Sequence, residues 1–244
     1  MTVSHLPPAK TGRDVPTAAS LGKDVPVTTP RPLHELVDVQ RPAWPWIQGL
    51  IAGSELVVEV LPVDPDQGRR TLHQLQVTAG SALGAIALNT GGVIIDYWVR
   101  LLGGGGALPA LGELAESGKM TVGYDLLGGR FALNGHALDG PPGGLWYWAP
   151  DTLKWESIDS TYSGLLEWFL GGAITKFYQD RYWTDWRSDA ARAEPWQGIT
   201  LFPPPFTKEG ADVDKVSRRI IGMTELLNLY TDTARQLAGK GPDD

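Results

Sequence analysis

Residues 120–135 read MTVGYDLLGGRFALNG, and residues 145–156 read LWYWAPDTLKWE. The pair Gly128-Gly129 lies between two alternating runs, and consecutive glycines readily adopt the positive φ values of a tight hairpin turn. The second stretch is rich in aromatic residues and is interrupted at Pro150, which predicts two further strands with a turn between them. Together the two stretches predict a meander of antiparallel strands.

The turn also predicts the register of the first hairpin. If the two glycines form the turn, Leu126 pairs with Phe131. In the same register Tyr124 pairs with Leu133, so the large apolar residues share one face of the sheet. The opposite face then holds four residues: Asp125, Arg130, Ala132 and Asn134.

A second glycine pair lies in residues 83–103, LGAIALNTGGVIIDYWVRLLG. The runs on both sides of Gly91-Gly92 are apolar, which predicts a second hairpin buried at the centre of the sheet. In this register Asp96 lies opposite Ala87.

The flanking segments complete a predicted α+β fold, in which one domain spans residues 33–238 and helices cover a mostly antiparallel sheet. Residues 1–32 contain few large apolar side chains and are predicted to be a disordered tail, as are residues 239–244. Helices are predicted to begin at Leu33, Pro42, Asp64-Pro65, Leu111, Thr161 and Ile174, with a last helix that buries Leu226 and Tyr230; strands are predicted at 55–62 and 197–202.

Composition restricts the function classes. The net charge of −7 and the pI near 5.1 argue against nucleic acid as a partner and suit a basic protein partner. The chain has no cysteine, which excludes disulfides and thiolate chemistry. The sequence shows no apolar run of membrane-spanning length and no signal peptide pattern, so we expect a cytoplasmic protein without a membrane partner.

The sequence contains none of the motifs that would identify a reaction. It lacks a Gly-x-Ser-x-Gly elbow and a His-Glu-x-x-His pair, and its four histidines form no metal-binding pattern. The run Gly103–Gly106 is followed by neither a Gly-Lys-Ser/Thr sequence nor an uninterrupted helix, so it predicts a loop rather than a phosphate site. We therefore expect no cofactor and no metal.

A polar face of the predicted sheet is the candidate binding face. Asp96 there could bind a ligand, but buried carboxylates are more often paired for the sake of the fold, and we predict a structural role for it. Convergence of Asp96, Asp125, Asp151 and Glu156 on a sugar stays open as an alternative. The candidate residues are Asp96, Trp98, Arg100, Asp125, Asn134, His136 and Trp148.

Two blocks, residues 81–103 and 127–156, resemble a bacterial family of uncharacterised proteins of unknown function. The strand pair followed by Ala-Pro-Asp-Thr-Leu-Lys-Trp-Glu is also similar to the SUKH superfamily. The SUKH resemblance implies an α+β fold and a non-enzymatic immunity protein that neutralises a toxin. Two functions therefore stay open: a binding protein with a protein partner such as a basic toxin, and a hydrolase that acts on a sugar or similar polar ligand.

Overall fold

The computed structural model describes residues 29–239, and all but the first two belong to a compact unit that begins at Arg31. The tails predicted at 1–32 and 239–244 lie almost entirely outside the described residues. This unit has an α+β fold, and its main sheet is antiparallel throughout.

The main sheet has the order β1-β2-β3-β5-β6-β7-β8, with β4 paired to β5, and a separate ribbon is formed by β9 and β10. The strands are β1 Val58–Leu61, β2 Gly92–Ile95, β3 Val99–Leu102, β4 Ala115–Glu116, β5 Lys119–Asp125, β6 Arg130–Asn134, β7 Leu145–Ala149, β8 Lys154–Ile158, β9 Gln197–Phe202 and β10 Ser217–Gly222. The helices are α1 Leu33–Val37, α2 Trp44–Ala52, α3 Pro65–Leu75, α4 Ala82–Asn89, α5 Tyr162–Leu170, α6 Ile174–Phe177, α7 Trp186–Ala190 and α8 Met223–Gly239.

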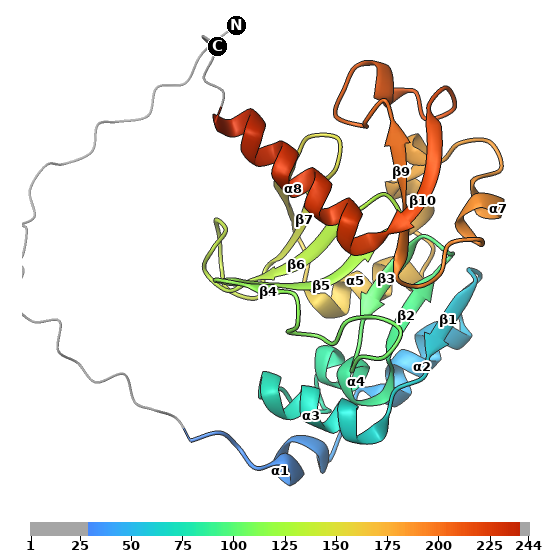
Figure 1. The fold of residues 1–244 in the computed structure, drawn as a ribbon. Coiled ribbons are helices and arrows are strands. Elements are labelled where there is room, and N and C mark those ends of the chain that lie inside the picture. The colour runs from blue at the N-terminus through green and yellow to red at the C-terminus, as the bar shows by residue number, and fades with distance from the viewer. Residues whose placement is uncertain (1–28, 240–244) are drawn as a thin grey trace, which may run out of the picture. The chain divides into compact units, whose positions relative to one another are not determined.

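Different elements cover the two faces of the sheet. On one face Phe131 packs edge-on against Phe169 of α5, with ring centroids 5.2 Å apart. On the other face Trp148 packs against Tyr230 of α8, at 6.0 Å. Figure 1 shows α8 crossing the sheet over β5 and β6, beside the ribbon of β9 and β10. The hydrophobic core therefore forms two layers, one on each side of the sheet.

The hairpin predicted at Gly91-Gly92 is wrong, because residues 82–89 form helix α4 instead of a strand. Ser81 caps this helix by accepting a 3.0 Å hydrogen bond from the amide of Gly84, a typical N-cap contact. A run in which nearly all residues are apolar fits a buried strand and a buried helix equally well, so its hydrophobic periodicity could not distinguish the two. The predicted pairing of Asp96 with Ala87 is therefore wrong as well.

The real turn in this region lies between β2 and β3, where Ile95 pairs with Val99. Asp96 and Tyr97 occupy it with φ values of 49° and 59°, and the amide of Trp98 donates to the carbonyl of Ile95 at 3.0 Å. Aspartate tolerates this left-handed conformation better than most residues. The Gly91-Gly92 pair instead joins α4 to β2.

The hairpin predicted at Gly128-Gly129 is present as β5 and β6, but its register differs. Tyr124 pairs with Arg130 rather than with Leu133, because the turn runs from Asp125 to Gly129 and is wider than predicted. Tyr124 and Arg130 therefore share one face, and Phe131 lies on the other.

Other elements confirm the predictions from caps and periodicity. Strands β7 and β9 and helix α8 lie where the sequence predicted them, and Asp64 and Thr161 cap α3 and α5. The helix predicted at Leu111 is wrong: the chain turns there, at Gly112 with a φ of 88°, and continues into β4. Strand β10 was not predicted, since its residues appeared charged and turn-like.

Candidate functional site

Asp96 is buried against a side chain from α7. Its carboxylate accepts two hydrogen bonds from the Arg187 guanidinium, at 2.7 and 3.3 Å. The Asp96 side chain is 3% exposed, whereas that of Arg187 is 55% exposed and lies over the Trp186 ring at 4.4 Å. The carboxylate thus has a partner from the protein itself, the arrangement expected of a structural role.

Trp98 fills the space between the sheet and the segment around α7. It is fully buried and its ring contacts four aromatic rings, among them Tyr182 at 4.8 Å and Trp186 at 5.1 Å. Arg100 is also buried and donates to the carbonyls of Tyr97 and Trp98, at 2.7 and 3.0 Å. Burial lowers the pKa of Arg100 to about 10. Trp98 lines no pocket among the described residues, and Arg100 lines a cavity between the sheet and the segment after α7.

Asp125 closes the turn between β5 and β6. One carboxylate oxygen accepts hydrogen bonds from the amides of Leu127 and Gly129, at 2.9 and 2.8 Å. The other accepts from the hydroxyls of Tyr147 and Tyr178, at 2.6 and 3.0 Å. Burial raises the pKa of the Asp125 carboxyl, although all four hydrogen bonds oppose that shift. This carboxylate therefore organises the fold, and both of its oxygens accept hydrogen bonds from the protein itself.

Asn134 is the last residue of β6, and His136 lies in the loop that follows it. The Asn134 side chain donates to the carbonyls of Leu138 and Gly140 and accepts from the amides of His136 and Leu138. The imidazole of His136 is exposed, and its backbone φ is 101°. Asn134 shapes the loop, and the structure brings no other candidate residue to His136.

Trp148 lies on the face of the sheet that α8 covers. In register, Arg100, Tyr124, Arg130 and Trp148 follow one another across four strands. The guanidinium of Arg130 lies over the Trp148 ring at 4.8 Å and over the Trp155 ring at 5.4 Å. Trp148 therefore supports an arginine that the predicted site did not include.

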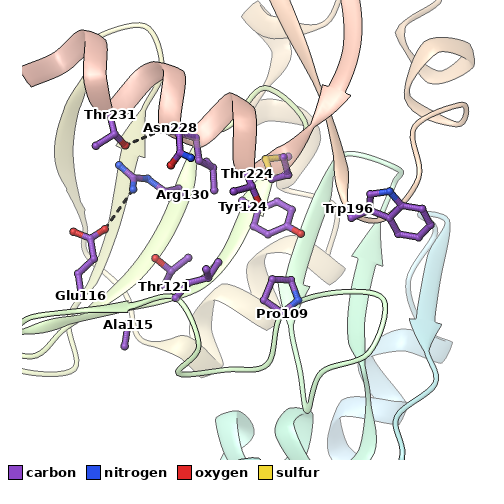
Figure 2. Close-up of a pocket in the computed structure, with 13 residues that line it drawn as sticks. Pro109, Ala115, Glu116, Thr121, Tyr124, Arg130, Trp196, Thr224, Asn228 and Thr231 are labelled. Carbon is purple, nitrogen blue, oxygen red and sulfur yellow. Dashed lines mark hydrogen bonds and ion pairs between the residues drawn. The ribbon is translucent and has the colours of Figure 1, made fainter. Parts of the chain in front are cut away.

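Arg130 lines a pocket between the sheet and α8 with a volume of about 250 Å³. The floor comes from the sheet, one wall from the segment that leads into β4, and the other from α8, with Trp196 at one end (Figure 2). The floor residues are Thr121, Tyr124 and Arg130; the walls include Pro109, Leu114 and Glu116 on one side and Met223, Thr224, Leu227, Asn228 and Thr231 on the other.

The two ends of this α8 pocket differ in polarity. Figure 2 shows Arg130, Glu116 and Thr231 at one end, and Pro109 and Trp196 at the other. The Arg130 guanidinium donates to Glu116 at 3.4 Å, but its buried Nε has no hydrogen-bond partner among residues 29–239. Burial also lowers the pKa of Arg130, which Glu116 counteracts. A buried guanidinium donor without a partner is costly to the fold and suits an acceptor supplied by a ligand.

Comparison with known proteins identifies the family. Residues 33–226 match the profile of a family described as "Protein of unknown function DUF2625". The chain belongs to the DUF2625 family. Two relatives extend this result: the putative uncharacterized protein YbfG of Escherichia coli K12 is 34% identical over 205 residues, which cover 80% of this chain and 94% of YbfG. An uncharacterized protein of Haemophilus influenzae Rd is 30% identical over 190 residues, which cover 72% of this chain and 83% of that protein.

No solved structure matches significantly. The predicted likeness of this DUF2625 protein to the SUKH superfamily stays a prediction, as does its cytoplasmic location. Within residues 29–239, no helix is long and apolar enough to cross a membrane. The same residues contain no group of three histidines, cysteines or carboxylates placed to bind a metal ion.

Sequence reasoning missed most of the α8 pocket of this DUF2625 protein. It placed Arg130 on the face opposite Tyr124, and it considered only the apolar stripe of the last helix. The signal that was available is a second stripe: Thr224, Asn228 and Thr231 recur at helical spacing beside Leu227 and line the pocket.

Proposed function

We propose that this protein acts as a binding protein for a small molecule, which the α8 pocket holds without catalysing its conversion. The observation that carries the proposal is the buried guanidinium of Arg130, whose Nε is aimed at no acceptor within the described residues. Around it lie hydroxyl and amide side chains from α8 and an apolar end at Trp196. A few polar groups converging in an apolar pocket are typical of small-molecule sites.

The hydrolase alternative receives less support. Hydrolysis of a glycoside usually requires two carboxyl groups on opposite sides of the scissile bond. Of the described residues that line the α8 pocket, only Glu116 carries a carboxylate. Asp96 and Asp125, which the sequence offered as partners, are bonded to Arg187 and to Tyr147 and Tyr178.

Mass spectrometry under native conditions tests this proposal. Asn228 is exposed on α8 and lines the pocket, so Asn228→Trp fills the cavity without removing a buried group. Leu229, the next residue, is 48% exposed and lies outside the lining, so Leu229→Trp is the matched control. We expect the protein purified from its host to retain a small molecule that Asn228→Trp lacks and Leu229→Trp keeps. The proposal is contradicted if both variants retain the molecule equally. It is also contradicted if neither the parent protein nor the variants retain any molecule.

A protein partner, such as a basic toxin neutralised by binding, is a second proposal. It is supported by the net charge of −7, because an acidic protein accelerates its association with a basic one. The test is calorimetry with a basic toxin encoded beside the gene. A complex that weakens steeply with salt supports this role, and no heat of binding at low salt contradicts it.

A further inference from the structure

We infer that the ligand of the α8 pocket is a small monocarboxylate with an apolar body, and that its carboxylate takes the place of Glu116 at the guanidinium of Arg130. This inference rests on the proposed function and adds the chemical class of the ligand. It is carried by the charge balance at one end of the pocket, by the geometry of Arg130, and by the apolar character of the other end.

The charges at the polar end do not cancel. Glu116 bridges two cations, Arg130 at 3.4 Å and Lys119 at 2.5 Å, which leaves one positive charge without a counterpart. Of the described residues that line the pocket, only Arg130 and Glu116 are charged, and Lys119 contacts the site through Glu116. A single carboxylate would neutralise this end, whereas a phosphate monoester, with a charge of about −1.5 to −2, would exceed it.

Arg130 is packed into the fold, whereas Glu116 is half exposed. The Arg130 side chain is 12% exposed and packed against two indole rings. The Glu116 side chain is 49% exposed and comes from a strand of two residues. Its contact with Arg130 is longer than the roughly 2.7–2.9 Å of a strong charge-assisted hydrogen bond. A ligand carboxylate can therefore displace Glu116 toward Lys119 and take its place at the guanidinium of Arg130.

The remainder of the pocket suits an apolar group. Pro109 and the exposed ring of Trp196 form the end away from Arg130, and the apolar side chains of Met223 and Leu227 also line the pocket. The volume of about 250 Å³ lies below the roughly 300–1,000 Å³ of sites for drug-sized molecules. The ligand is accordingly small, with its carboxylate at one end and its apolar part at the other.

Calorimetric titration of the full chain with two probes tests this inference. The probes are phenylbutyrate and phenylbutyramide, which have the same shape and differ in charge. We expect the acid to bind at least about tenfold more tightly than the amide. We also expect Glu116→Gln to tighten acid binding at least about fivefold by removing the competing carboxylate. The same substitution should leave amide binding unchanged, and Asn228→Trp should abolish binding of both probes.

Each contrary result has its own meaning. Equal binding of the acid and the amide overturns the carboxylate inference but leaves the pocket as a binding site. Weaker acid binding by Glu116→Gln overturns the displacement of Glu116. Failure of both probes to bind overturns the inferred ligand class. The proposed function is then tested separately, by the mass spectrometry experiment with Asn228→Trp.

Discussion

The Tyr147 hydroxyl donates a 2.6 Å hydrogen bond to the carboxylate of Asp125. This bond joins the turn between β5 and β6 to the aromatic strand β7, and a second bond from Tyr178 joins the turn to the segment after α6. Gly129 permits the close approach, since a Cβ at this position would lie 2.2 Å from the Asp125 carboxylate. Asp125 thus connects three parts of the chain that are distant in sequence.

Asp125→Ala should lower the free energy of unfolding by at least about 3 kcal/mol, because it leaves four buried donors without an acceptor. Asp125→Asn should cost less, since its amide oxygen can still accept from Leu127 and Gly129. Urea unfolding monitored by tryptophan fluorescence measures both. Equal losses in the two variants would contradict the role of the second carboxylate oxygen, and Tyr147→Phe should then cost nothing.

The stability should fall steeply at alkaline pH. Tyrosine in an unfolded chain ionises near its ordinary pKa of about 10, whereas burial raises the pKa of Tyr124 to about 12 in the folded protein. Burial raises the pKa of Tyr147 and Tyr178 as well. The stability conferred by a raised pKa is complete below the unfolded pKa and is lost as the pH rises through the folded one.

Tyr124 alone should account for a loss of roughly 3 kcal/mol between about pH 10 and pH 12. Arg100 acts in the opposite sense, since its lowered pKa of about 10 favours the folded state as the pH rises further, but the tyrosines outnumber it. Denaturant unfolding at successive pH values measures the loss, and tyrosinate absorbance should rise together with unfolding. Tyrosinate absorbance that rises near pH 10 while the protein stays folded would contradict the prediction.

Asp96→Asn should lower the melting temperature, with a loss of roughly 1–3 kcal/mol, because the ion pair with Arg187 is removed on its buried side. Asparagine tolerates the left-handed backbone of this position, so the effect reports the charge rather than strain. Arg187→Gln should cost at least as much, since it leaves a buried carboxylate unpaired. A melting temperature unchanged in Asp96→Asn would make this carboxylate a candidate for ligand binding.

The glycine run after β3 should be needed for packing. A Cβ on Gly104 would lie 2.4 Å from the carbonyl oxygen of Ala87 in α4, so Gly104→Ala should destabilise the protein by several kcal/mol. Gly49, within α2, has no atom within 4 Å of such a Cβ. Gly49→Ala is the matched control and should stabilise by roughly 0.5–1 kcal/mol. Thermal unfolding of both variants decides whether the glycines after β3 are needed to avoid steric contact or to keep the chain flexible.

Local chemistry was sufficient to predict part of the fold. The cap at Thr161 and the apolar spacing after it predicted α5, and the aromatic alternation predicted β7. The register at Gly128-Gly129 was predicted wrongly, because Asp125 closes a wider turn by accepting from the amides of Leu127 and Gly129. The two tyrosine hydroxyls that also bond Asp125 approach it only in the folded chain. The prediction for residues 82–89 was wrong for another reason. An apolar run without interspersed polar residues shows no periodicity that separates a strand from a helix.

The α8 pocket depends even more on tertiary structure. Its residues come from the segment before β4, from β5 and β6, from Trp196 and from α8, so no window of sequence contains more than a part of it. The correct register of β5 and β6 would have placed Tyr124 and Arg130 on one face. Even then, the partner of that face could be recognised only once α8 was known to cross it.

The position of α8 in the chain has a consequence for folding. This helix follows all ten strands, yet it covers the face of the sheet that bears Tyr124, Arg130 and Trp148. During synthesis the meander is complete at Ile158, 65 residues before α8 begins at Met223, so α8 cannot cover the aromatic face of the sheet at that stage. Contacts between residues so far apart form slowly, and the nascent sheet is then exposed to association with other chains.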